Sequence, residues 1–189
     1  MYSLGLIPGS FKPWHLGHHL LMCKAAEECE RVSIIAGVAD RTRKDQFIIK
    51  GSDMELIWRY HIEPTLPANV GVIFSHSPLH DAYDTIIALN DAQSILTIAV
   101  YGDAEDVTTR FQKKTLERYA NWSLQNNKVI LRGIPRTITA QVSGTRVRNC
   151  LMKGDFTAFC SMMPLHLELD VIWEILHGRN DELKFRSSL

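Results

Sequence analysis

Short apolar segments alternate with segments of helical periodicity along most of the chain. Apolar runs rich in β-branched residues predict strands at residues 2–7, 32–38, 70–74, 94–101 and 128–131. Amphipathic patterns between these runs predict helices at residues 16–29, 52–61, 80–90 and 104–119. From residue 143 onward the pattern is wholly helical, in at least two pieces separated by Gly154 and Pro164.

This alternation favours an α/β fold. Strands that alternate with helices form right-handed βαβ units, which build a parallel sheet with helices on both faces. Ligands of such sheets bind at the carboxyl ends of the strands, near the point where the strand order reverses. No repeat or linker interrupts the 189 residues, so we expect one domain, 1–189, with a helical C-terminal extension from about residue 143.

The composition narrows the classes of function. The 21 basic and 21 acidic residues leave no net charge, so no global field attracts nucleic acid or an anionic membrane. The sequence shows neither a secretory signal pattern nor an apolar run of membrane-spanning length. We therefore expect a cytoplasmic protein that binds neither nucleic acid nor membrane. The cysteines lack metal-ligand spacing and are expected to be buried, reduced thiols: Cys23, Cys29, Cys150 and Cys160.

The richest chemical motif connects the first predicted strand to the first helix: Gly9-Ser10-Phe11-Lys12-Pro13-Trp14-His15-Leu16-Gly17-His18. Gly9 permits a tight turn close to an anion, and His15 and His18 share one helix face. Phosphoryl transfer depends on charge neutralisation at the phosphate oxygens, which two imidazoles, the Lys12 ammonium and a helix start can supply. A lone histidine here would be an ordinary surface residue, but the whole motif at this junction favours a site.

A second motif opens the C-terminal helical part. Ser143 is a natural N-cap, because its hydroxyl can accept from backbone N–H groups two or three residues further on. Arg146 and Arg148 then fall near the start of a helix, where cations oppose the helix dipole unless an anion neutralises them. The alternative is an ordinary capped helix with exposed arginines. We interpret the motif as a phosphate-binding helix start.

The first motif resembles the HxGH signature of the nucleotidyltransferase superfamily, which includes nicotinamide-nucleotide adenylyltransferases and cytidylyltransferases. The second is similar to the I-S-G-T-x-[IV]-R signature of archaeal-type adenylyltransferases, with valine in the leading position. The resemblance implies a Rossmann-like fold and contacts of His15 and His18 with the triphosphate. It also implies that the β- and γ-phosphates are bound by Ser143, Thr145 and Arg148.

Other candidate residues follow further predicted strands. Arg41, Arg43 and Lys44 can hold the phosphate of an acceptor, although a basic loop is more often merely solvated. Trp14 either touches that acceptor or packs on the next helix, and Asp103 either belongs to a nucleotide loop or caps a helix. The candidate nucleotide-binding residues are Gly9, Ser10, Phe11, Gly17, Tyr101, Gly102, Asp103, Ser143, Thr145, Arg146 and Arg148.

These motifs predict a nucleotidyltransferase that passes a nucleoside monophosphate, preferably AMP from ATP, to a phosphorylated small molecule such as nicotinamide mononucleotide, with release of pyrophosphate. His15, His18 and Lys12 are the predicted catalytic residues. The sequence contains no metal-ligand cluster, so Mg²⁺ is expected as a cofactor that travels with the triphosphate.

Two alternatives stay open at this stage. One is a CTP-dependent cytidylyltransferase that acts on a phosphorylated alcohol or sugar, and the less favoured one is a non-catalytic nucleotide-binding protein. Class I aminoacyl-tRNA synthetases share the HxGH motif but pair it with a lysine-rich loop that this sequence lacks. The sequence identifies neither the acceptor nor the oligomeric state, so a homo-oligomer is left open.

Overall fold

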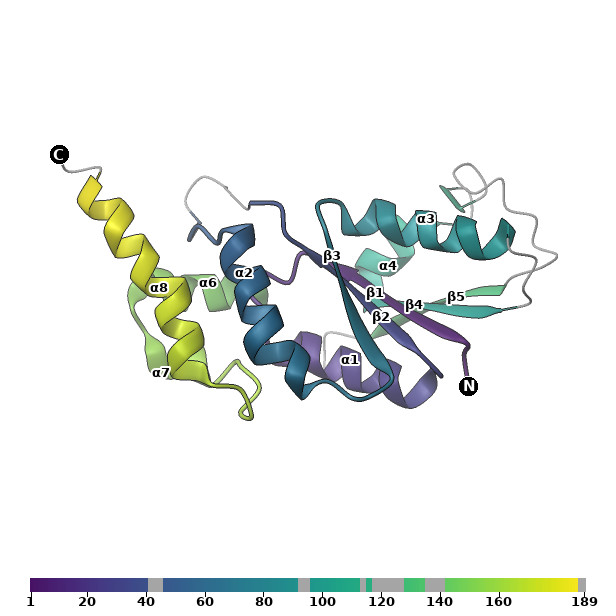
Figure 1. The fold of residues 1–189 in the computed structure, drawn as a ribbon, viewed down its shortest axis with the longest axis horizontal. Coiled ribbons are helices and arrows are strands. Elements are labelled where there is room, and N and C mark those ends of the chain that lie inside the picture. The colour runs from purple at the N-terminus through teal and green to yellow at the C-terminus, as the bar shows by residue number, and fades with distance from the viewer. Residues whose placement is uncertain (41–45, 92–95, 113–114, 117–127, 135–141, 187–189) are drawn as a thin grey trace.

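A parallel sheet forms the centre of the computed structural model, which describes residues 1–40, 46–91, 96–112, 115–116, 128–134 and 142–186. Within these residues, five strands are ordered β3-β2-β1-β4-β5 (Figure 1). Their bounds are β1 Leu4–Gly9, β2 Val32–Gly37, β3 Val70–Ser75, β4 Thr97–Asp103 and β5 Lys128–Ile134. Leu6 of β1 pairs with Ser33 on one side and with Val100 on the other, and every strand pair is parallel. The predicted parallel sheet is confirmed.

Helices connect the strands and continue beyond the sheet. The connecting helices are α1 Leu16–Glu28, α2 Gly51–Ile57, α3 Pro78–Asp91 and α4 Ala104–Arg110. The C-terminal helices are α6 Gly144–Lys153, α7 Phe156–Cys160 and α8 Leu169–Arg186. Gly154 ends α6 in the left-handed conformation with φ 70°, and Pro164 lies between α7 and α8, so both predicted breaks are confirmed.

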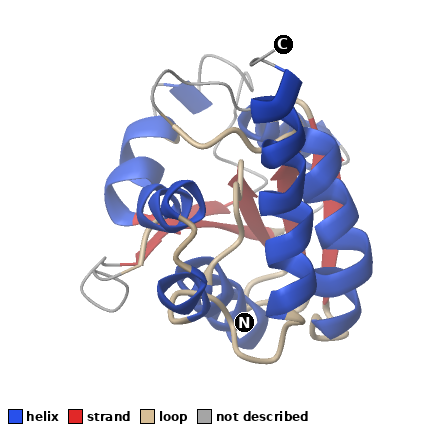
Figure 2. Cartoon of the chain, turned by 90° about the vertical axis from the view of Figure 1, so that its left-hand side faces the viewer, coloured by secondary structure: helices blue, strands red, loops and turns tan. Residues whose placement is uncertain are grey.

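The two faces of the sheet are covered by different helices, because successive side chains of a strand point to opposite faces. Leu6, Ile35 and Val100 pack with residues of α3, whereas Ile7, Ile34 and Ala99 belong to the larger cluster that includes α1 and the C-terminal helices. Figures 1 and 2 show the strands enclosed between these helical layers. Because both faces of the sheet are buried, the sequence of each strand is a nearly continuous apolar run.

Two predicted helices differ from the observed ones. The helix predicted at residues 52–61 is α-helical only in α2 and continues as the π-helix Trp58–Ile62 and a 3₁₀ turn, Glu63–Thr65. The wider turn still leaves Trp58 and Ile62 buried in the core. Within the helix predicted at residues 104–119, α4 ends at Arg110, where the chain turns at Phe111 and buries that ring against Tyr83. Residues 115 and 116 are helical again, and residues 113–114 and 117–119 lie outside the described ones.

The cysteines are less buried than predicted. All four are free thiols, but only Cys29 is buried. The other three line the margin of the large core cluster, where a thiol is packed on one side only: Cys23, Cys150 and Cys160. In the part of the chain that the structure describes, no helix is long and apolar enough to cross a membrane.

Candidate active site

His15 and His18 lie together at the start of α1, directly after β1. His15 is the N-cap residue of α1, yet its side chain makes no capping hydrogen bond. Its ring is stacked on that of His18, with 3.6 Å between the centroids and 20° between the planes. The Nδ1 atoms of both rings are buried and have no hydrogen-bond partner among the described residues. Buried polar atoms without partners are uncommon in folds and mark places where a ligand or water completes the structure.

Both imidazoles are held in the neutral form. Burial, helped by the positive charge of Arg148, lowers the pKa of His15 from 6.5 to about 4. Burial and the neighbouring His15 lower the pKa of His18 well below its usual value. The sequence suggested that two imidazoles supply positive charge, but in the free protein near pH 7 both rings are neutral. Each neutral ring carries one N–H group that can donate to a ligand.

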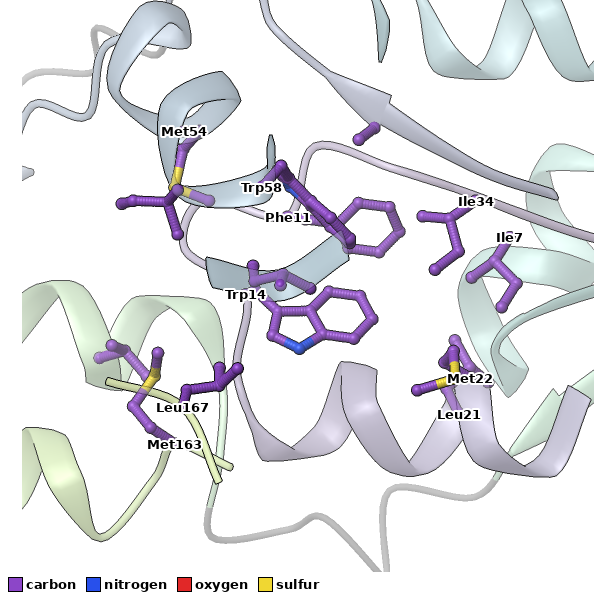
Figure 3. Close-up of a cluster of buried hydrophobic side chains, with 14 of the residues drawn as sticks. Ile7, Phe11, Trp14, Leu21, Met22, Ile34, Met54, Trp58, Met163 and Leu167 are labelled. Atoms are coloured by element: carbon purple, nitrogen blue, oxygen red, sulfur yellow. The ribbon is translucent and has the colours of Figure 1, made fainter. Parts of the chain in front are cut away.

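The aromatic residues of the first motif belong to the core. The ring of Phe11 packs edge-on against Trp14 at 5.4 Å and Trp58 at 5.9 Å between centroids (Figure 3). It also packs edge-on against the ring of His18 at 4.9 Å. Phe11 has φ 44°, a left-handed conformation that costs a non-glycine residue about 1–2 kcal/mol. Trp14 is 1% exposed and also contacts Trp58. The structure thus places the rings of Phe11 and Trp14 in the buried core, where both lie against the ring of His18.

Lys12 is buried as well, although it was predicted to face a phosphate. Its ammonium donates a hydrogen bond to the carbonyl oxygen of Ala39, just after β2. Its own carbonyl oxygen accepts a hydrogen bond from Arg148 of α6. Lys12 therefore fastens the loop between β1 and α1 to two other segments of the chain.

The second motif begins α6 as predicted. The hydroxyl of Ser143 caps the helix by accepting from the backbone N–H of Arg146 at 3.3 Å, which confirms the predicted N-cap. Thr145 and Arg146 are exposed in the first turn. Arg148 is buried, so the alternative of a capped helix with exposed arginines does not hold at this position. Its guanidinium donates a hydrogen bond to the carbonyl oxygen of Lys12, which lies 136 residues earlier in the chain. This contact joins the two motifs.

The carboxyl end of β4 differs from its predicted role at two positions. The hydroxyl of Tyr101 donates to Glu28 at 2.7 Å, at the end of α1 opposite to His15, so its side chain lies away from the histidines. A Cβ added to Gly102 would lie 2.5 Å from Val107, so this glycine serves the packing of α4. Asp103 accepts from the backbone N–H of Glu105 at 3.1 Å and caps α4, which confirms the capping alternative.

The remaining candidates are placed as follows. Ser10 is exposed beyond β1, and Gly17 lies partly buried in the first turn of α1. The three predicted acceptor-binding cations fall outside the described residues: Arg41, Arg43 and Lys44.

The start of α3 also borders this region. A Cβ added to Gly37 would lie 3.0 Å from Cα of Ser10 and 3.3 Å from Cγ of Pro78. The ends of β1 and β2 and the start of α3 therefore meet here. The signal in the sequence was the position of Ser77 and Pro78 just after a predicted strand.

The sheet topology places these residues at the expected ligand-binding edge. The strand order reverses between β1 and β4, and both motifs meet beyond the carboxyl end of β1. Among the described residues, the one group with three ligand atoms close enough for a metal ion is His80, Asp81 and Asp84 on α3. That group is separate from the histidine pair.

Two of the solved structures that resemble this chain indicate its fold. Plasmodium falciparum nicotinic acid mononucleotide adenylyltransferase, complexed with NaAD, aligns with a TM-score of 0.60 and 14% identity, over 92% of this chain and 97% of its own. Thermotoga maritima TmcAL, bound with alpha-thio ATP, aligns with a TM-score of 0.52 and 13% identity, over 96% of this chain and 56% of its own. No family model and no curated protein matches the sequence. The similarity shows the fold and confirms the Rossmann-like architecture that the motifs implied.

Proposed function

We propose that the chain is a nucleotidyltransferase that passes AMP from ATP to a phosphorylated small molecule such as nicotinamide mononucleotide, releasing pyrophosphate. One observation carries this proposal: beyond the carboxyl end of β1, the loop that leads to the stacked His15–His18 pair is hydrogen-bonded to Arg148 of α6. The ligands of the two similar structures, NaAD and alpha-thio ATP, support an adenine nucleotide as the donor.

The proposed reaction is an in-line displacement at the α-phosphorus of ATP. A phosphate oxygen of the acceptor forms the new P–O bond while the bond to the β-phosphate oxygen breaks, and pyrophosphate leaves. His15 and His18 stabilise the charge that develops on the phosphate oxygens by donating N–H groups, which a neutral imidazole can do. No covalent enzyme intermediate is required.

The start of α6 is proposed to hold the triphosphate tail. Its first N–H groups lack helical partners, and the helix dipole favours an anion there. The exposed side chains of Thr145 and Arg146 lie in the same turn. Mg²⁺ is proposed to be carried by the triphosphate oxygens, where it would neutralise the leaving pyrophosphate.

A pyrophosphate-release screen tests this proposal. The protein is incubated with ATP or CTP and Mg²⁺, each crossed with a panel of phosphorylated acceptors that includes nicotinamide and nicotinic acid mononucleotides, sugar phosphates and phosphorylated alcohols. We expect acceptor-dependent release with ATP. Preference for CTP would replace the adenylyl donor by a cytidylyl donor, and absence of release in every combination would contradict nucleotidyl transfer.

A further inference from the structure

Strand β3 forms one edge of the sheet (Figure 1). It pairs with β2 in an unbroken register from Val70 to Ser75, and on its other side the described part of the chain contributes no strand. An unpaired edge presents N–H and C=O groups that can bind another strand, so soluble proteins usually protect it with charged residues, proline or a bulge. The sequence of β3, Val-Gly-Val-Ile-Phe-Ser, contains no charged residue and no proline. This edge is therefore open to another strand.

Alternate residues supply the hydrogen-bonding groups of the open edge. Backbone N–H groups in and just after β2 donate to the carbonyl oxygens of Asn69 and Ser75, both at 2.8 Å. The backbone groups of successive residues in a strand point to opposite sides, so the odd-numbered residues of β3 face β2. The N–H and C=O groups of Val72 and Phe74 and the C=O group of Val70 therefore point to the open edge. The N–H group of Val70 already donates within the preceding turn.

The side chains of β3 add an apolar surface beside this edge. Val72 and Phe74 pack against the large core cluster, so Gly71 and Ile73 point to the opposite face of the sheet. Ile73 is 49% exposed there. A Cβ added to Gly71 would meet no atom within 4 Å, so the space next to Ile73 is open. An apolar side chain and an open space thus lie two residues apart on the same face.

We propose that this edge is the contact surface of a homodimer, in which the β3 strands of two copies pair antiparallel about a two-fold axis at Val72. The two Val72 residues then exchange both N–H···O=C hydrogen bonds, and each Phe74 N–H donates to Val70 of the other copy. Gly71 of each copy lies opposite Ile73 of the other. The two Ile73 residues are diagonal neighbours, about 7–8 Å apart, and their side chains meet over the spaces that the glycines leave. The same surface is used twice, so the contact closes at two copies.

Charges beside the strand favour the antiparallel direction. The guanidinium of Arg59 lies 4.5 Å from the ring centroid of Phe74, near the carboxyl end of β3. Its exposed ion pair with Glu55 uses Nε and Nη2 and leaves Nη1 for a further carboxylate. Glu63 is exposed one helical turn later, toward the loop that leads into the amino end of β3 (Figure 1). Antiparallel pairing brings Arg59 of each copy toward Glu63 of the other, whereas parallel pairing would place like charges together.

The size of the contact sets its expected strength. Stable interfaces bury about 1,200–2,000 Å² in total. The proposed ladder spans only residues 70–74 of each copy and so lies at the small end of this range. We therefore expect a dissociation constant of about 1–100 µM and not a permanent dimer.

Mass and amide exchange test the proposal on the wild-type protein. Analytical ultracentrifugation between about 1 and 300 µM should show the mass rise from that of one chain, 21.5 kDa, toward twice that value. Hydrogen exchange followed by NMR has its control within the same strand. The amides of Val72 and Phe74 should gain protection as the protein concentration rises, because they point to the open edge. Those of Gly71 and Ile73 face β2 and should be protected at every concentration.

A charge at the axis tests the register. Ile73→Lys places two ammonium groups near each other in the dimer but leaves the core of each chain intact, so the dissociation constant should rise at least about tenfold. The midpoint of thermal unfolding at low concentration should stay near that of the wild type. Leu165→Lys is the matched control, because Leu165 is 87% exposed between α7 and α8. This variant should dimerise like the wild type.

Three results would overturn the proposal. One is a wild-type protein that remains monomeric at about 300 µM. The others are a dimer that persists unchanged in Ile73→Lys and a dimer that forms without protecting the amides of Val72 and Phe74. If Ile73→Lys does not fold, the amide exchange of the wild type decides. None of these measurements involves a nucleotide, so they hold whether or not the protein releases pyrophosphate.

Discussion

The imidazole ring of His15 stacks on that of His18 with 3.6 Å between the ring centroids, at the start of α1. Two protonated rings would repel each other at this distance, and burial removes the water that would screen them. The pair therefore stays neutral in the free protein. Its chemistry is that of two oriented N–H donors beside one buried guanidinium.

The lowered pKa of His15 makes stability depend on pH. The unfolded chain binds a proton at this residue near pH 6.5, whereas the folded protein does so only near pH 4. The unfolded state therefore binds more protons between these values, and the folded state loses stability as the pH falls from 6.5 toward 4. Between pH 7 and pH 5 we expect His15 to account for about 2 kcal/mol of lost unfolding free energy.

Urea unfolding at pH 7 and pH 5 measures this contribution. His15→Asn should show a smaller loss between the two pH values than the wild type by about that amount. His80→Asn, at an exposed histidine of α3, is the control and should behave like the wild type. The same loss in all three proteins would contradict the assignment.

Glu28 is expected to matter for stability and not for turnover. Its carboxylate accepts two hydrogen bonds from Arg132, at 2.7 and 3.1 Å, and one from the hydroxyl of Tyr101. The hydrogen bonds from Arg132 are the main cause that lowers the pKa of Glu28 to about 2. Glu28→Gln should lower the unfolding free energy by about 1–2 kcal/mol at pH 7 and leave kcat unchanged.

The pH dependence provides a check on Glu28. Because its folded-state pKa is lowered, its contribution is present above about pH 4.5 and is lost as the pH falls toward 2. Glu27→Gln, at an exposed neighbour, is the matched control and should change stability little. Loss of activity in a folded Glu28→Gln protein would show that this end of α1 takes part in the reaction.

Substitution of Trp14 distinguishes a role in core packing from a role in binding the acceptor. Because its indole is buried against Phe11 and Trp58, Trp14→Phe should lower the unfolding free energy by about 1–3 kcal/mol. The KM of the acceptor should change less than about threefold, since a buried indole does not touch it. An acceptor KM raised more than tenfold, with stability unchanged, would restore the acceptor role.

The sequence predicted the alternation of elements well because each strand is a continuous apolar run between turn residues. The caps at Ser143 and Asp103 were also predictable, since an N-cap requires only a side-chain oxygen and nearby backbone N–H groups. The sequence also predicted that residues following different strands share one edge of the sheet, since parallel strands place their carboxyl ends together.

Burial within the site was not predictable, because it depends on contacts between distant segments. Nothing local in the second motif indicates that Arg148 turns inward to Lys12, 136 residues away. The neutral state of His15 and His18 follows from the same packing. Tyr101 was misplaced for a related reason: its position after a buried strand suggested a nucleotide, but its side chain reaches Glu28.

The most direct measurement of the central claim is pyrophosphate release by His18→Ala, with ATP, Mg²⁺ and the acceptor that the screen identifies. We expect kcat to fall by at least about 100-fold, the usual cost of one lost transition-state donor, while the dissociation constant of ATP changes less than about threefold. His80→Ala, at the exposed histidine of α3, should keep wild-type turnover. Near-normal turnover by a folded His18→Ala protein would contradict a reaction carried by this histidine pair.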